Sequence, residues 1–220
     1  MKRLAAVLIA APLLLTGCVV PYGGATPSAT NAPSDGDDTP SATQGPPAGA
    51  KTFSTLDKAG IEKIKASKAA IFDMTTGWLS KESVGLEDGS SQAPAVSITD
   101  GTMFLVVEGP VGAVSAQTDR FRMNGMNTGS NFSEVTYFLT AQSLDEYTAM
   151  IRDGVDRYGI DHESAERVIE SISSTPEDKT DFAIQPGTKT GLQVTYDLRY
   201  DGSKDTQVII VHVNPMQSKS

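Results

Sequence analysis

The C-terminal part of the chain carries the pattern that most constrains the fold. From Leu192 to Tyr200, apolar side chains occupy every second position and polar side chains lie between them. This period of two predicts a strand with one buried face and one wet face. After a turn at Asp201–Asp205, the run Val208–Val213 is apolar on both faces except at His212, which predicts a central strand covered on each side. We therefore expect a sheet that contains two long antiparallel strands.

Upstream of these strands, apolar stretches bounded by turn residues predict two further pairs of strands. Asp100-Gly101 lies between the first pair, and glycine suits the positive dihedral angles of a two-residue hairpin turn. Asn124-Gly125 opens a longer polar loop between the second pair. The four strands are expected at residues 95–99, 102–107, 113–123 and 132–141.

Two consecutive helices separate the early strands from the late ones. Ser143 and Glu146 form a capping box, and Gly159 ends this helix in a left-handed cap. Asp161 caps the next helix, which ends before Pro176. Because the connection between the two helices is short, we expect an αα-hairpin.

The order of elements favours an α+β fold. A first helix, capped by Ser54 or Thr55, is expected to extend to about residue 70, and residues 71–90 form either a short strand or a loop. With hairpin connections between the strands, this order predicts a single α+β domain at residues 53–220. Its sheet is mainly antiparallel, and its helices, including the αα-hairpin, pack on one face. A cone-shaped sheet wrapped on helices, or a half-barrel with an apolar lumen, would share the pattern.

The N-terminus has the three-part layout of an export signal. Lys2 and Arg3 form a basic start, Leu4–Leu15 is apolar, and small residues precede Cys18. The apolar run is too short to remain as a membrane-spanning helix. We expect residues 1–17 to be a signal peptide.

The sequence Leu15-Thr16-Gly17-Cys18 resembles the lipobox of bacterial lipoproteins. This resemblance implies cleavage between Gly17 and Cys18 and attachment of a thioether-linked diacylglycerol to Cys18. Further acylation, such as a palmitate chain, would give the two or three chains that stable anchoring needs. The resemblance therefore implies a protein anchored in the cell membrane by lipid, with its domain facing outside the cytoplasm.

Residues 18–52 are expected to be a disordered tether behind the lipidated cysteine. Pro, Gly, Ser, Thr and Ala dominate this stretch, and no periodic apolar face offsets the entropy cost of ordering it. The composition is similar to that of tethers in lipoproteins of high-GC Gram-positive bacteria. Such a tether would carry the domain away from the membrane surface.

Charge and residue usage exclude several classes of function. The chain has 27 acidic and 18 basic side chains, a formal net charge of −9. A chain this acidic is repelled by phosphate backbones, which argues against nucleic acid binding. With the one cysteine used for anchoring and two histidines not spaced as ligands, we expect no metal site and no cofactor.

We assign no catalytic residue from the sequence. It has no Gly-x-Ser-x-Gly motif, and the turn at Asp201–Asp205 lacks the later ligands of a calcium loop. The strongest candidates for a binding site are Arg120 and Arg122, which flank Phe121 on a predicted strand and would project from one face. Trp78, Met123 and Met126 are expected in loops, where such side chains often form adaptable surfaces.

These observations predict a membrane-anchored cell-envelope lipoprotein whose extracytoplasmic domain is not an enzyme. The domain is expected to bind a lipid or other amphiphile, or a protein partner of the envelope. Two alternatives remain open. One is an envelope hydrolase that uses carboxylates from distant strands, and the other is a structural or assembly subunit of an envelope complex.

Overall fold

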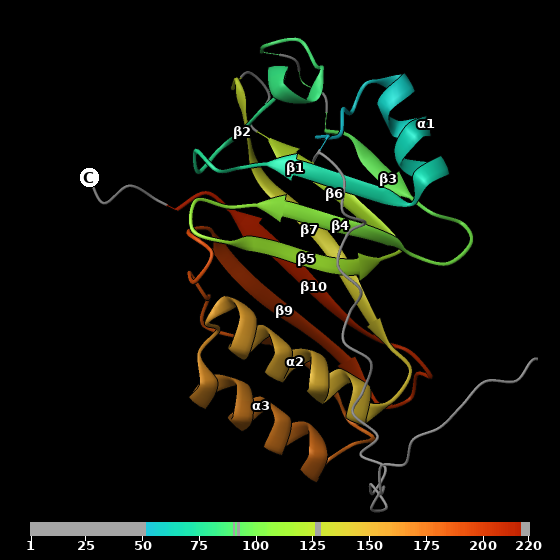
Figure 1. Cartoon of the computed structure of the whole chain (residues 1–220). Helices are drawn as coiled ribbons and strands as arrows, with labels where there is room; N and C mark the ends of the chain where they lie inside the picture. Colours follow the sequence, from blue (N-terminus) through green and yellow to red (C-terminus); the bar gives the residue numbers. More distant parts are fainter. Residues whose placement is uncertain (1–51, 90, 92, 126–128, 217–220) are drawn as a thin grey trace, which may run out of the picture. The chain divides into compact units, whose positions relative to one another are not determined.

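The computed structural model describes residues 52–89, 91, 93–125 and 129–216, which belong to one compact unit, Gly45–Ser220. The predicted signal peptide and nearly all of the predicted tether lie outside these residues. The described part contains three α-helices and ten strands in two sheets, and nearly all strand pairs are antiparallel. The predicted α+β fold class is therefore confirmed (Figure 1).

The larger sheet has the strand order β3-β6-β7-β10-β9-β8, and the two-residue strand β2 also pairs with β7. The predicted C-terminal strands are neighbours in it, with Val211 opposite Tyr196. Their connection is a hairpin turn closed by Gln207, whose side chain bonds to the backbone of Asp201 and Lys204. The strands are β2 (Leu79–Ser80), β3 (Ala95–Ser97), β6 (Arg120–Gly125), β7 (Asn131–Ala141), β8 (Lys179–Ala183), β9 (Gln193–Asp201) and β10 (Gln207–Asn214).

The smaller sheet consists of β1 (Ala69–Asp73), β4 (Met103–Glu108) and β5 (Ala113–Thr118), in the order β1-β4-β5. β1 and β4 are parallel. The chain passes from this sheet to the larger one at Asp119, between β5 and β6. There the buried hydroxyl of Thr118 lies 2.8 Å from the carbonyl oxygens of Arg120 and Phe138, so the crossing point is tied to both sheets.

The expected hairpin at Asp100-Gly101 is wrong. Gly101 has the positive φ of 78° that suggested a turn, but β3 pairs with β6 while β4 lies between β1 and β5. The physical reason is burial: Leu105, Val106 and Val107 are consecutive buried residues, so both faces of β4 need cover. The predicted strand at 113–123 is likewise two strands, in different sheets.

The helices are α1 (Lys58–Ser67), α2 (Leu144–Tyr158) and α3 (His162–Ser174), and a short 3₁₀ helix, η1, spans Glu82–Val84. The α1 boundaries differ from those expected, because its cap is Asp57, which accepts a 2.6 Å hydrogen bond from the Gly60 backbone, and it ends before Lys68. The caps predicted for α2 and α3 are confirmed.

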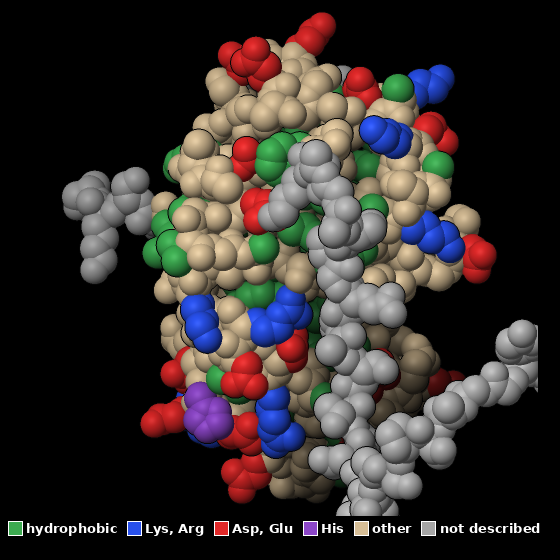
Figure 2. All heavy atoms as spheres, viewed as in Figure 1, with side chains coloured by type: hydrophobic (Ala, Val, Ile, Leu, Met, Phe, Trp, Pro, Cys, Tyr) green, Lys and Arg blue, Asp and Glu red, His purple; other side chains and the backbone are tan. Residues whose placement is uncertain are grey.

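The capping box at the start of α2 is modified. Ser143 accepts from the Glu146 amide at 3.1 Å, but the Glu146 carboxylate accepts from Gln142 instead of Ser143. α2 and α3 lie side by side (Figure 1). A bidentate ion pair between Arg152 and Glu166 joins them. On their outer side, Figure 2 shows acidic and basic side chains intermingled rather than a patch of one sign.

α2 and the smaller sheet both pack on one face of the larger sheet. Tyr147 of α2 lies 5.6 Å from the ring of Tyr200, and Phe72 of β1 meets Phe121 of β6 edge-on at 5.4 Å. The contact with α2 is so close that a Cβ on Gly154 would lie 2.7 Å from the Tyr196 ring. Large side chains thus fill the space where a half-barrel would have its lumen.

The opposite face of the larger sheet is only half-buried. Along β10, buried Ile209 and Val211 alternate with partly exposed Ile210 and His212. The expectation that β10 is covered on both faces is therefore wrong, although it is a central strand. The apolar residues of its second face are shielded by neighbouring side chains within the sheet, such as Phe138 beside Ile210.

Candidate functional site

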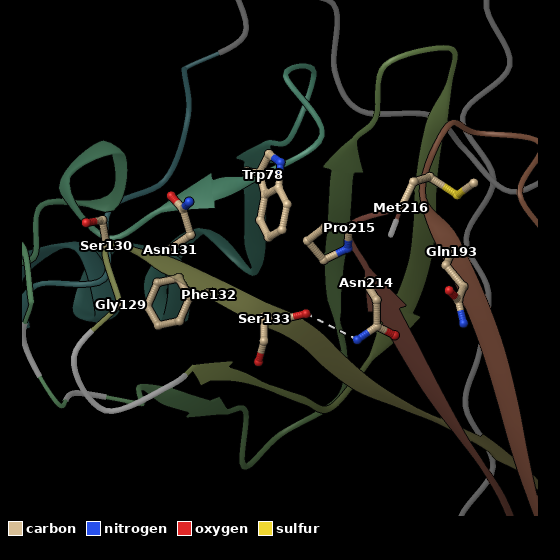
Figure 3. A pocket seen from close by; sticks show the side chains of 10 residues that line it. All are labelled: Trp78, Gly129, Ser130, Asn131, Phe132, Ser133, Gln193, Asn214, Pro215 and Met216. Atoms are coloured by element: carbon tan, nitrogen blue, oxygen red, sulfur yellow. Dashed lines mark hydrogen bonds between the residues drawn. The ribbon is translucent and has the colours of Figure 1, made fainter. Parts of the chain in front are cut away.

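The candidate site lies at a break in the pairing of β7. This strand pairs with β10 over Val135–Ala141 and with β2 over Asn131–Phe132. Phe132 also pairs with β6 on the other side, so β2 and β10 follow one another along the same edge of β7. Between them, at Ser133, lies a pocket of about 590 Å³ (Figure 3). We call it the notch pocket.

The notch pocket has an apolar part and a polar part. Trp78 and Met216 are 47% and 44% exposed, so two of the four large exposed hydrophobic residues of the described chain meet here. Figure 3 shows the Trp78 indole facing Pro215, with Met216 and Gln193 farther along. Among the described residues, none of the side chains that line the pocket is charged. The lining residues are Trp78, Gly129, Ser130, Asn131, Phe132, Ser133, Gln193, Asn214, Pro215 and Met216.

Local structure places Trp78 and Pro215 on either side of the break. The Gly77 amide bonds to Met74 O at 2.8 Å in a tight turn after β1, and Gly77 has a φ of 89° that favours glycine. Trp78 follows at once and precedes β2. Pro215 has no backbone N–H and so cannot extend the ladder of β10.

The Asn214 side chain partly replaces the missing strand. Its Nδ2 donates to the carbonyl oxygen of Ser133 and to Oε2 of Glu134, each at 3.2 Å. Both hydrogens of this amide are therefore used, and Oδ1 remains as an acceptor of fixed orientation. Figure 3 shows the bond to Ser133.

Glu134 is the centre of a polar cluster next to the pocket. Its carboxylate accepts from Asn124 Nδ2 at 2.5 Å, from the Thr136 hydroxyl, from His212 Nδ1 at 3.1 Å and from Asn214. Burial by itself raises the pKa of Glu134, but hydrogen bonds from His212, Thr136 and Asn214 and the nearby imidazole outweigh it and lower the pKa to about 2. The carboxylate is thus ionised near neutral pH.

The Glu134 carboxylate is better suited to holding the Asn214 side chain in place than to transferring a proton. A carboxyl group with a pKa near 2 does not carry the proton that a general acid needs at neutral pH. Its acceptor positions are already occupied by the four donors, and it holds the Asn214 amide against the pocket. The described residues contain no group of three or more His, Cys, Asp or Glu that could hold a metal ion.

The structure places the two predicted arginines outside the notch pocket. They share the half-buried face of the larger sheet, because they alternate with buried Phe121 along β6. Arg120 lies 3.4 Å from the Asp119 carboxylate and 4.2 Å above the ring of Phe138. Arg122 is exposed. A role for this pair in binding an anionic group stays a prediction.

The other predicted residues have mixed outcomes. Gly17 and Cys18 lie outside the described residues, as does Met126. Met123 is fully buried in β6, so its expected loop position is wrong. His212 is hydrogen-bonded to Glu134, and Trp78 does lie in a loop.

Sequence reasoning missed the polar part of the pocket. Ser133, Gln193 and Asn214 come from three strands, and Asn214 and Ser133 are 81 positions apart. One local signal was present, namely the Asn214-Pro215 pair that ends an apolar strand. It marks the end of pairing but gives no information about the partner.

Comparison with known proteins gives no match to this chain among family models, curated proteins or solved structures. Within the described residues, no helix is long and apolar enough to cross a membrane.

Proposed function

We propose that this protein is a cell-envelope lipoprotein whose extracytoplasmic domain binds an uncharged ligand in the notch pocket, without catalysis. Cys18 carries the diacylglyceryl anchor, and residues 18–52 are the tether. The observation that carries the binding proposal is the pocket itself, in which the exposed Trp78 and Met216 lie beside a fixed amide and the lining residues that the structure describes carry no charge.

The composition of the pocket supports binding of a ligand. Apolar walls with a few oriented polar groups are typical of small-molecule sites, and a volume of 590 Å³ lies within their usual range. Exposed Trp and Met side chains that meet at one place mark an interaction site more often than scattered ones do. Because Asn214 is held by two hydrogen bonds, the polar part is formed before a ligand arrives.

The ligand is uncharged, because a charged group in this pocket would lose hydration without gaining an ionic partner. The carboxylate bonded to Asn214, that of Glu134, already accepts four hydrogen bonds. A bound cation would have to displace one of these donors. An anion would be repelled by Glu134.

The chain contains a single tryptophan, so its fluorescence reports on the pocket alone. The protein used is residues 19–220, which contain the whole compact unit. It is titrated with two fractions of a bacterial envelope, namely water-soluble glycans and lipids extracted into organic solvent. We expect one of them to shift or quench Trp78 emission. Asn214→Ala, which removes the fixed acceptor, is expected to weaken the response at least tenfold.

Val111→Ala is the matched control, because Val111 is 78% exposed and does not line the pocket. It is expected to leave the response unchanged. Ligand binding in the notch pocket would be refuted if neither fraction changed Trp78 emission in the parent chain. It would also be refuted if Asn214→Ala responded as strongly as the parent.

A further inference from the structure

The polar side chains of the notch pocket are all amides or hydroxyls. They are Ser130, Asn131, Ser133, Gln193 and Asn214. Amide groups offer both donors and acceptors, and hydroxyls do the same through one oxygen. Such a lining matches a ligand that also donates and accepts at several positions.

Several of these groups are available to a ligand. The side chains of Asn131 and Gln193 make no hydrogen bond to any residue in the described part of the chain. Asn214 has both amide hydrogens engaged, so its Oδ1 needs a donor from the ligand. A ligand that offers an O–H or N–H toward Asn214 would therefore complete the hydrogen bonding of this side chain.

The opposite wall requires an apolar surface on the same ligand. Trp78 lies beside Pro215 (Figure 3) and is 47% exposed, so part of its indole surface is open to a ligand. A pyranose or furanose ring has this combination, because one face presents C–H groups and its rim carries hydroxyls. Aromatic side chains with a polar rim of amides suit such an amphipathic ring.

An acyl chain fits the pocket less well. It has no donor for Asn214 Oδ1 and no partner for Asn131 or Gln193. These polar groups would lose their hydrogen bonds to water and gain none from the chain. It would also stay partly in contact with water, because Trp78 and Met216 are exposed. The interior, where a chain could be shielded, is filled by Phe72, Phe121 and their neighbours.

We propose that the ligand of the notch pocket is an uncharged saccharide, with one sugar ring stacked on Trp78 and its hydroxyls bonded to Asn131, Gln193 and Asn214. The inference rests on the proposed function and names its ligand class. A domain tethered at the membrane surface would in this way hold a neutral glycan of the envelope.

The test is a glycan array that carries neutral oligosaccharides of hexoses, pentoses and N-acetylhexosamines beside sialylated, uronic acid and sulfated ones. Residues 19–220 are expected to bind neutral glycans and not the acidic ones. The neutral glycan that binds best is then titrated by calorimetry. We expect Trp78→Ala and Asn214→Ala each to weaken binding at least tenfold, and Trp78→Phe to retain more affinity than Trp78→Ala.

Phe53→Ala is the control, because Phe53 is a similarly exposed aromatic residue, at 41%, outside the notch pocket. It is expected to bind as the parent does, and circular dichroism checks that every variant is folded. The saccharide proposal is overturned if no neutral glycan binds, or if Trp78→Ala binds the glycan as tightly as the parent. If the lipid fraction alone changes Trp78 emission, the saccharide proposal fails while the pocket remains a binding site. If neither fraction does, both proposals fail.

Discussion

Replacing Glu134 with glutamine tests whether its carboxylate organises the cluster behind the notch pocket. The side chain is 19% exposed and accepts hydrogen bonds from Asn124, Thr136, His212 and Asn214. A glutamine has nearly the same shape but no charge, and its NH₂ group would face one of these donors. The substitution therefore removes charge-assisted hydrogen bonds and leaves at least one donor without an acceptor.

The lowered pKa of Glu134 sets the expected magnitude. The pKa falls from an ordinary value of 4.5 to about 2 in the folded protein. This difference corresponds to about 3 kcal/mol of folding free energy that depends on ionisation of the carboxyl group. Because the folded pKa is the lower one, the contribution is fully present above pH 4.5 and is lost as the pH falls toward 2. Glutamine cannot titrate, so Glu134→Gln lacks this dependence.

The assay is urea unfolding of residues 19–220 followed by far-ultraviolet circular dichroism, at pH values from 7 to 2.5. At pH 7 we expect the free energy of unfolding of Glu134→Gln to be about 3 kcal/mol lower than that of the parent. This gap in the free energy of unfolding is expected to narrow as the pH falls below 4.5. Other carboxyl groups titrate in both proteins, so the difference isolates Glu134. Glu163→Gln is the control, because Glu163 is 86% exposed and should show no such gap. A gap that is absent at pH 7, or that stays constant down to pH 2.5, would refute the role assigned to the carboxylate.

Two further substitutions test the packing and the anchor. Gly154→Ala is expected to lower the free energy of unfolding by about 1–3 kcal/mol, because the added methyl group would lie 2.7 Å from the Tyr196 ring. Helix propensity alone predicts a gain of about 1 kcal/mol for the same change, so a raised melting temperature would contradict the packing. Cys18→Ala in the full chain is expected to accumulate as unprocessed or unlipidated protein, which mass spectrometry of the purified chain checks. Normal processing and detergent-phase partitioning of this variant would contradict the lipid anchor.

Much of the fold could be predicted where the signal is local. The caps of α2 and α3 depend on side chains that bond to a backbone amide three residues away, as Ser143 and Asp161 do. The pairing of β9 with β10 follows from alternation and a short turn. In these cases the residues that form the structure are close in the sequence, so their chemistry can be read directly.

Strand partners that are distant in the sequence could not be predicted. Asp100-Gly101 has suitable chemistry for a hairpin, but β4, with its consecutive buried residues, instead forms the centre of the smaller sheet, where β1 and β5 pair along its two edges. Local turn chemistry is weak compared with burial of an entire strand. The parallel pairing of β1 with β4 therefore replaced the expected hairpin.

The sequence by itself determined the identity of most elements, the caps of two helices, the acidic charge and the lipobox resemblance at Cys18, because each depends on neighbouring residues or on composition. Only the tertiary structure decided which strands distant in the sequence meet and that β2 and β10 leave a gap along β7. It also brought Trp78, Ser133, Gln193 and Asn214 to that gap from four separate segments. The physical reason is that pairing is selected by burial over the whole domain, and a pocket forms where that pairing ends.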